Sequence, residues 1–174
     1  MKYYIISGEA SGDLHGSKLI EALKEKDKKA QIRCWGGDLM KKAGGELVKH
    51  FNELAFMGFW EVITNLEAII RNIKFCKKNI LEFDPDVIIY IDYPGFNLRI
   101  SKWAKKQGFK NHFYISPQVW AWKENRVHQM KKNLDALYVI LPFEKEFFEI
   151  KHQFSVEFVG HPLLDRVMHS EKNS

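Results

Sequence analysis

The chain has 174 residues, of which 45% are hydrophobic and 28% are charged, so it favours one domain with an ordinary core. Its net charge of +5 favours an anionic partner such as phosphate, nucleotide, nucleic acid or anionic lipid, without choosing among them. No apolar run approaches 18 residues and no basic-then-apolar leader opens the chain, so we expect neither secretion nor a membrane-spanning helix.

The first predicted elements are a strand over 3–7 and an amphipathic helix over 17–27, joined by a glycine-rich stretch over 8–16. A glycine-rich turn before a helix presents backbone N–H groups that can hold a phosphate or sugar hydroxyls. The glycines are spaced by four, which is neither the dinucleotide-binding nor the Walker pattern. They are equally consistent with a tight turn alone.

The next predicted elements are a strand over 31–35, a short helix capped by Asp38 and a strand over 46–51. A long helical pattern then covers 59–83, with aromatic residues at its start and basic residues toward its end. Any core helix has an apolar face. The same pattern also suits a helix that lies on an anionic membrane. We expect Cys34 and Cys76 to be buried free thiols of a reducing compartment, since they lack metal-ligand spacing.

A run of five apolar or aromatic residues at 87–91 predicts a strand buried on both faces, typical of the middle of a parallel sheet. Asp92 follows it directly, and open α/β sheets bind their ligands at the carboxyl ends of such strands. Pro94 and Gly95 predict a turn, and Asn97 is placed to cap a helix over 98–107. Asp92 is therefore a candidate site residue, although it could simply cap the turn.

A strand over 111–115 leads into a loop at 116–126 that carries two tryptophans, a lysine and an arginine. These side chains could stack on and pair with a ligand, or the tryptophans could be core. A helix over 124–133, a strand over 136–141, a helix over 142–151 and a strand over 156–159 follow. The β-α alternation predicts a doubly wound, mostly parallel Rossmann-like sheet. The polar segments 8–13, 36–38, 92–97 and 116–126 should then meet at one sheet edge.

Six motifs occur in a fixed order: GEASGD at 8–13, LAFMG at 54–58, IDYPGFN at 91–97, SPQVWAW at 116–122, LPFE at 141–144 and FVGHPL at 158–163. With them the chain resembles the lipid-A-disaccharide synthases, which are inverting glycosyltransferases of the GT-B type. The resemblance implies two Rossmann-like domains facing across a cleft. It also implies transfer of 2,3-diacylglucosamine from UDP-2,3-diacylglucosamine to 2,3-diacylglucosamine 1-phosphate (lipid X).

The resemblance further implies a cytoplasmic protein that lies peripherally on the inner-membrane surface and needs no metal or redox cofactor. A nucleic-acid partner is not expected, because the basic residues are spread over several helices. Residues 1–165 match the amino-terminal, acceptor-side domain, and 166–174 are expected to be a frayed tail. The carboxy-terminal UDP-binding domain is missing from this chain, so it would be supplied in cis or in trans. The chain alone is then expected not to turn over.

By this resemblance Asp92 is the predicted general base, whereas Gly95 stands where some relatives carry a second acid. Lys123 and Arg126 are the candidates for the acceptor phosphate. The predicted substrate contacts are Glu9, Ser11, Gly12, Asp13, Asn97, Ser116, Gln118, Trp122, Lys123 and Arg126. The predicted exposed membrane or acyl-chain patch is Phe59, Trp60, Val62, Ile63, Leu66, Ile69 and Ile70. Two alternatives remain open: another GT-B glycosyltransferase, or a non-catalytic domain that binds a lipid or a partner.

Overall fold

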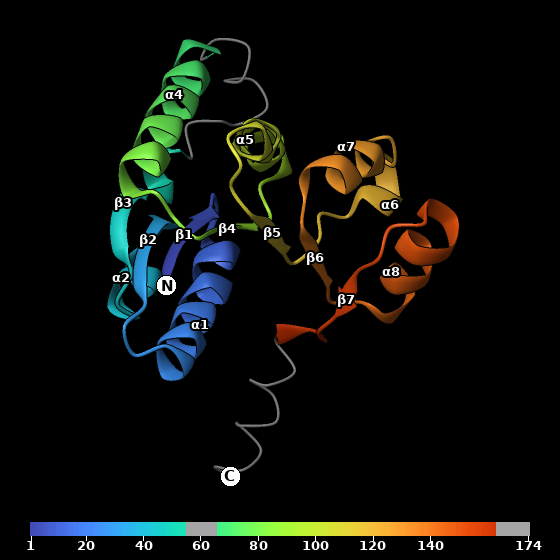
Figure 1. Cartoon of the computed structure of the whole chain (residues 1–174), viewed down its shortest axis with the longest axis horizontal. Helices are drawn as coiled ribbons and strands as arrows, with labels where there is room; N and C mark the ends of the chain where they lie inside the picture. Colours follow the sequence, from blue (N-terminus) through green and yellow to red (C-terminus); the bar gives the residue numbers. More distant parts are fainter. Residues whose placement is uncertain (55–65, 163–174) are drawn as a thin grey trace.

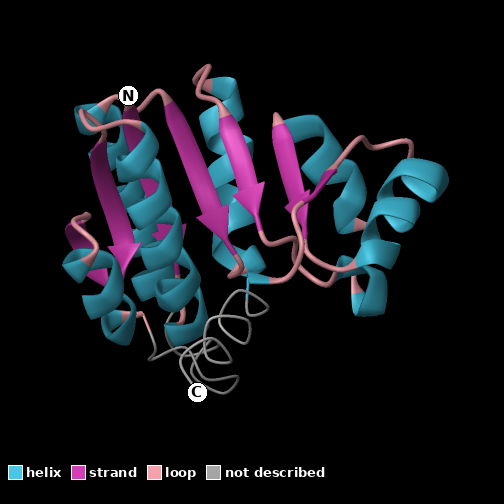
Figure 2. Ribbon diagram, turned by 90° about the horizontal axis from the view of Figure 1, so that it is seen from below, coloured by secondary structure: helices cyan, strands magenta, loops and turns pink. Residues whose placement is uncertain are grey.

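The computed structural model describes residues 1–54 and 66–162, and they form a layered α/β domain around a seven-stranded sheet (Figures 1 and 2). Every strand pairs in parallel with its neighbours, in the order β3-β2-β1-β4-β5-β6-β7. The strands are β1 (Lys2–Ser7), β2 (Gln31–Gly36), β3 (Glu46–His50), β4 (Val87–Ile91), β5 (Asn111–Tyr114), β6 (Ala136–Val139) and β7 (Glu157–Phe158). The predicted doubly wound parallel sheet is confirmed.

Helices cover both faces of the sheet (Figure 2). They are α1 (Ala10–Lys26), α2 (Asp38–Lys42), α4 (Leu66–Phe83), α5 (Pro94–Lys106), α6 (Val119–Trp122), α7 (Arg126–Asn133) and α8 (Pro142–Glu146). A 3₁₀ turn, η1 (Phe51–Glu53), follows β3, and a π-helical turn, η2 (Phe147–Lys151), continues α8. Figure 1 shows α1 and α2 on one face, and α4, α5 and α7 on the other.

The two central strands supply both halves of the core because their side chains alternate between the faces. Tyr4 and Ile6 of β1 join the cluster that includes α4 and α5 side chains, with Cys76 and Ile80 from α4. Their neighbours in β1 join the other cluster, in which Ile20 of α1 packs beside the sheet. All of β4 is buried, as predicted for a central parallel strand.

Two helices begin earlier than the sequence predicts. The helix α1 begins at Ala10 rather than near residue 17, so most of the glycine-rich stretch is helical rather than a loop. The helix α5 begins at Pro94, with Tyr93 as its N-cap, so the predicted cap at Asn97 is wrong. Proline fits the first helical position because its missing N–H has no partner there in any helix. Asp38 is likewise the first residue of α2 and not its cap, which is Gly37.

Two of the later helices are divided differently from the prediction. The predicted helix over 124–133 begins at Arg126, behind the separate single turn α6. The predicted helix over 142–151 is α8 followed by the π-helical η2. Both cysteines are free and buried, as predicted. Burial raises the pKa of the Cys34 thiol to about 12, which keeps it unreactive.

Candidate functional site

The two central strands, β1 and β4, mark the point where the winding of the sheet reverses. Ser7 pairs with Ile91 in parallel register, so both strands end side by side. From these ends the chain enters α1 on one face and α5 on the other (Figure 1). A crevice at the carboxyl ends of strands, beside such a reversal, is where open α/β sheets bind ligands.

Asp92 lies at this reversal point, half-buried, directly after β4. Its φ is +47° and that of Tyr93 is +50°, so two consecutive residues with side chains adopt the left-handed conformation. Non-glycine residues rarely do so, and such strain gathers at functional sites. The prediction that Asp92 ends the central strand is confirmed, and its role as a general base stays a prediction.

Two histidines share this place with Asp92, one on α1 and the other after β7. Burial lowers the pKa of His15, the nearby His161 lowers it further, and the Asp92 carboxylate opposes both. The Asp92 carboxylate and the His161 imidazole are therefore both close enough to His15 to affect its protonation. No sequence pattern singled out His15, which lies inside the expected loop over 8–16, and His161 entered the prediction only as part of the FVGHPL motif.

Tyr93 fills the space between the ends of β1 and β4. A Cβ added to Gly8 would lie 2.4 Å from the Tyr93 ring, so only glycine allows this approach. Burial raises the pKa of the Tyr93 hydroxyl to about 12, with the Glu9 charge acting in the same direction and Arg99 opposing it. Glu9 and Ser11 are exposed at the start of α1, as their predicted substrate contacts require.

Gly12 and Gly16 lie one turn apart on α1 and serve close packing. A Cβ on Gly12 would lie 2.2 Å from the Ser7 hydroxyl oxygen, and one on Gly16 would lie 2.6 Å from the Met40 sulfur. Both glycines are buried. The four-residue spacing therefore reflects helix contacts rather than a phosphate-binding loop, and the interpretation of 8–16 as a loop is corrected.

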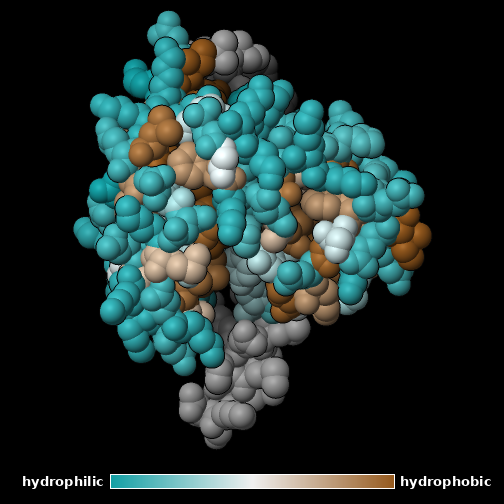
Figure 3. Space-filling model, in the orientation of Figure 1, coloured by the Kyte–Doolittle hydropathy of each residue, from teal (hydrophilic) through white to brown (hydrophobic). Residues whose placement is uncertain are grey.

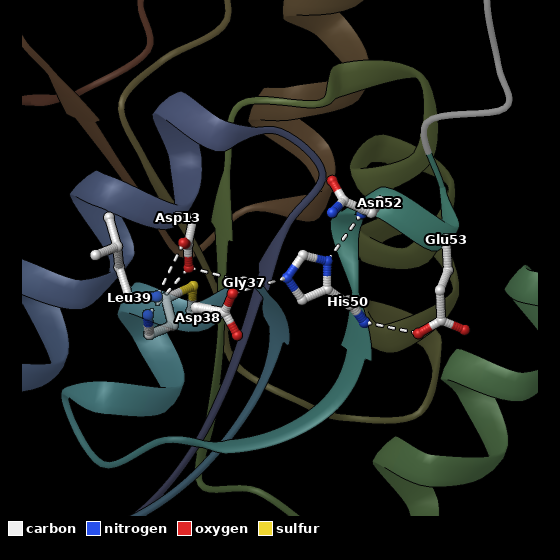
Figure 4. Close-up of polar contacts among 8 residues, drawn as sticks. Asp13, Gly37, Asp38, Leu39, His50, Asn52 and Glu53 are labelled. Carbon is white, nitrogen blue, oxygen red and sulfur yellow. Dashed lines mark hydrogen bonds and ion pairs between the residues drawn. The ribbon is translucent and has the colours of Figure 1, made fainter.

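Asp13 is buried and binds the first turn of α2 (Figure 4). Its Oδ1 accepts hydrogen bonds from the backbone N–H groups of Gly37 at 2.7 Å and Met40 at 3.0 Å, and its Oδ2 accepts one from Leu39 at 3.1 Å. The Asp13 carboxylate of α1 thus caps the N-terminus of α2, as an N-cap side chain of α2 itself would otherwise do. Asp13 was predicted to contact substrate, but in this structure backbone donors occupy both of its oxygens.

Asn97 is fully buried beneath the Asp92 turn. Its amide nitrogen donates to the Asp92 carbonyl at 2.7 Å, and lies 3.4 Å from the carbonyls of Ile6 and Ile91. Its Oδ1 is buried without a hydrogen-bond partner among the described residues. Asn97 was predicted to contact substrate, yet its burial places it against backbone rather than at a surface that a substrate reaches.

The predicted binding loop at 116–126 divides into a buried and an exposed part. Ser116 is buried, with its hydroxyl donating to the Pro117 carbonyl at 3.1 Å. The outward side chains are those of Gln118, Trp122 and Lys123, and Trp122 is 74% exposed. The Lys123 ammonium lies 5.5 Å from the centre of the Trp122 ring. These three and the half-buried Arg126 remain open to a ligand.

The predicted apolar patch is only partly visible. Phe59, Trp60, Val62 and Ile63 lie outside the described residues, and Leu66 begins α4. Ile70 is 45% exposed as predicted, but Ile69 is 8% exposed and belongs to the packed side of α4, so its assignment to the patch is wrong. Helical periodicity turns adjacent residues about 100° apart, and this separates them. Figure 3 shows apolar side chains at the end of α4 that adjoins the undescribed segment.

A shallow hollow on α4 is lined by Glu67, Ile70, Arg71 and Lys74. In the described ranges, no three His, Cys, Asp or Glu side chains are grouped to hold a metal ion. Within the same ranges, no helix is both long enough and apolar enough to cross a membrane.

The parallel sheet, with its strand order reversing between β1 and β4 and helices on both faces, defines a Rossmann-like α/β domain. The UDP-GlcNAc 2-epimerase from Neisseria meningitidis has this fold in half of its structure, which was solved with UDP-GlcNAc bound. The two share a TM-score of 0.66 at 14% identity, over 99% of this chain and 49% of the epimerase. At that identity the likeness concerns the fold alone.

Residues 3–174 match the lipid-A-disaccharide synthetase family, and the chain belongs to it. The lipid-A-disaccharide synthase of Trichlorobacter lovleyi is 44% identical over 94% of this chain and 42% of the relative. The one from Geobacter metallireducens is 43% identical over 98% of this chain and 44% of the relative. The chain therefore spans less than half the length of the curated relatives that it matches.

Proposed function

We propose that this chain is the acceptor-side half of a glycosyltransferase that makes lipid A disaccharide 1-phosphate. The reaction joins 2,3-diacylglucosamine from UDP-2,3-diacylglucosamine to lipid X and releases UDP. The family match over 3–174 carries the proposal. The position of Asp92, at the strand reversal beside His15 and His161, supports it.

Asp92 would act as the general base in this reaction. Inversion requires a base that removes the proton of the acceptor 6-hydroxyl while its oxygen attacks the anomeric carbon on the face opposite UDP. A half-buried carboxylate at a strand end is suited to this, because it is reachable from the crevice and held by a rigid strand. The step forms the new C–O bond, breaks the bond to UDP and leaves the proton on Asp92.

Around this base, the exposed residues divide by the chemistry they offer. Glu9 and Ser11 can hydrogen-bond sugar hydroxyls at the start of α1, beside its free backbone N–H groups. Lys123 and Arg126 can pair with the phosphate of lipid X. The exposed Trp122, whose ring centre lies 5.5 Å from the Lys123 ammonium, offers an apolar face beside this lysine.

Residues 1–165 would form the acceptor-side domain, and a carboxy-terminal domain would bind UDP. Ile70, with Arg71 and Lys74 beside it, would bring the domain to the inner-membrane surface, because both substrates carry acyl chains. On its own, this chain would bind the acceptor without catalysing transfer.

The test compares this chain alone with the chain joined to the carboxy-terminal half of the Geobacter metallireducens relative. Only the joined protein should convert the two substrates to disaccharide. In it, Asp92→Asn should lower kcat by about 100-fold or more, as expected on losing a general base. Near-normal turnover by Asp92→Asn would reject the catalytic role. Saturable binding of lipid X without turnover by the joined protein would instead favour the non-catalytic lipid-binding alternative.

A further inference from the structure

We infer that Asn97 is a positioning residue that sets the direction of the Asp92 carboxylate; this rests on the proposed function of Asp92. The two residues are joined by the 2.7 Å hydrogen bond from the Asn97 amide to the Asp92 carbonyl. Asn97 is fully buried, so it acts through Asp92 and not by touching a ligand.

The geometry that needs support is the pair of left-handed residues after β4. Asp92 and Tyr93 have φ values of +47° and +50°. Left-handed backbone angles are strained for residues with side chains, and they persist only where the surroundings hold them. Relaxation toward ordinary backbone angles would swing the Asp92 Cβ away from the sheet edge. The carboxylate keeps its direction only while this turn is held.

Contacts from α5 and from Gly8 hold the turn, and the Tyr93 ring stacks on that of Phe96 at 5.4 Å between ring centres. The backbone N–H of Asn97 donates to the Tyr93 carbonyl at 3.0 Å, as part of the first turn of α5. The Gly8 backbone confines the Tyr93 ring from the other side. The Asn97 side chain supplies a further contact and, among the described residues, it is the side chain that hydrogen-bonds to the carbonyl of Asp92 itself.

The Asn97 amide also lies within reach of the backbone of both central strands. The same nitrogen lies 3.4 Å from the carbonyl of Ile6 on β1 and 3.4 Å from that of Ile91 on β4. An amide nitrogen has two hydrogens to donate, whereas a leucine side chain has the same branched arrangement of four heavy atoms and no donor. Asn97→Leu therefore removes the donor while it keeps the branched shape of the side chain, which separates positioning from the mere presence of a side chain there.

The first experiment measures kcat and KM for lipid X in the joined protein described above. We expect Asn97→Leu to lower kcat by about tenfold or more while KM stays within about twofold, since a small misplacement of a catalytic group costs rate rather than binding. The matched control is Ser101→Ala on the same helix, because Ser101 is also fully buried and its hydroxyl donates only to the Leu98 carbonyl. This control should keep kcat within about twofold.

The second experiment needs no turnover. In isotope-labelled 174-residue chain, the Cα and Cβ chemical shifts of Asp92 and Tyr93 report their backbone angles. Asn97→Leu should move both residues out of the left-handed range, and Ser101→Ala should not. If Asn97→Leu yields too little folded protein, Asn97→Ser, which is too short to reach the Asp92 carbonyl, should move the same signals.

The outcomes separate the two proposals. A normal kcat in Asn97→Leu, together with a 100-fold loss in Asp92→Asn, would overturn the positioning role and leave the general base intact. A rise in KM at unchanged kcat would overturn it in favour of a substrate contact. Unchanged left-handed shifts in Asn97→Leu would overturn it whatever the activity. Normal turnover of Asp92→Asn would reject the proposal that Asp92 is the general base. The proposal that Asn97 positions it for catalysis would then be rejected as well.

Discussion

The indole of Trp120 donates its Nε1–H to the carboxylate of Glu144 at 3.2 Å. Glu144 is 1% exposed and also accepts from the backbone N–H groups of Ile140 at 3.1 Å and Leu141 at 2.9 Å. One buried carboxylate thus links α6, which follows β5, to the segment that joins β6 to α8. Trp120 belongs to the SPQVWAW motif and Glu144 to the LPFE motif, so this contact gives one residue of each motif a structural role.

Replacing Glu144 should therefore destabilise the domain. Glu144→Ala takes the acceptor from three partly buried donors, and a hydrogen bond to a charged group contributes about 1.5–3 kcal/mol, so we expect the free energy of unfolding to fall by about 3 kcal/mol or more. Glu144→Gln retains one acceptor oxygen and should lose less. Urea unfolding measures both, with the exposed Glu146→Ala as the matched control. Equal losses in Glu144→Ala and Glu146→Ala would contradict this role.

A second prediction concerns which aspartate caps α2. Asp13→Ala should lower the free energy of unfolding by about 3 kcal/mol, because three N–H groups lose their acceptor. Asp38→Ala should change it by less than about 0.5 kcal/mol, since the Asp38 side chain is 91% exposed. Hydrogen exchange at Leu39 and Met40 should accelerate only in Asp13→Ala. The reverse ranking would restore Asp38 as the cap, as predicted from sequence.

A third prediction concerns acid stability. Burial is the main cause that lowers the pKa of both His15 and His112 in the folded chain. Their unfolded value is about 6.5, so as the pH falls through and below that value the unfolded chain takes up more protons than the folded one. Stability is therefore lost as the pH falls, and it is regained above about pH 6.5.

Unfolding in urea at about pH 7.5 and about pH 5 measures this dependence in variants, because the unperturbed pKa of histidine lies between these two values. The fall in stability should be smaller in His112→Gln than in the unchanged chain. The exposed His128→Gln serves as the control and should leave the fall unchanged. An equal fall in all three proteins would show that His112 is not a source of acid lability.

A fourth prediction separates the two neighbouring isoleucines of α4. Ile69→Ser should lower the free energy of unfolding by about 2–5 kcal/mol, because Ile69 is 8% exposed and its removal leaves a cavity. Ile70→Ser should leave stability nearly unchanged, because Ile70 is 45% exposed. If α4 meets the membrane, Ile70→Ser should weaken binding to anionic vesicles in a sedimentation assay. Equal vesicle binding by Ile70→Ser and the unchanged chain would remove Ile70 from that surface.

Local sequence by itself determined the order of the elements and the parallel sheet. The buried strand β4 was predicted because a run of β-prone residues can be buried on both faces only in the middle of such a sheet. The position of Asp92 followed, since the apolar run ends there. The motifs also placed the chain in its family, which the comparison over residues 3–174 confirmed.

The tertiary structure decided what each marked residue does. Gly12 and Asp13 looked like parts of a binding loop. In the folded chain Gly12 packs against Ser7 at the end of β1, and Asp13 caps the first turn of α2. Asn97 looked like a cap, but its amide reaches back beneath β4. Such partners are brought together only when strands and helices pack, so no local pattern encodes them. For the same reason, the proximity of His15 to Asp92 became evident only from the folded chain.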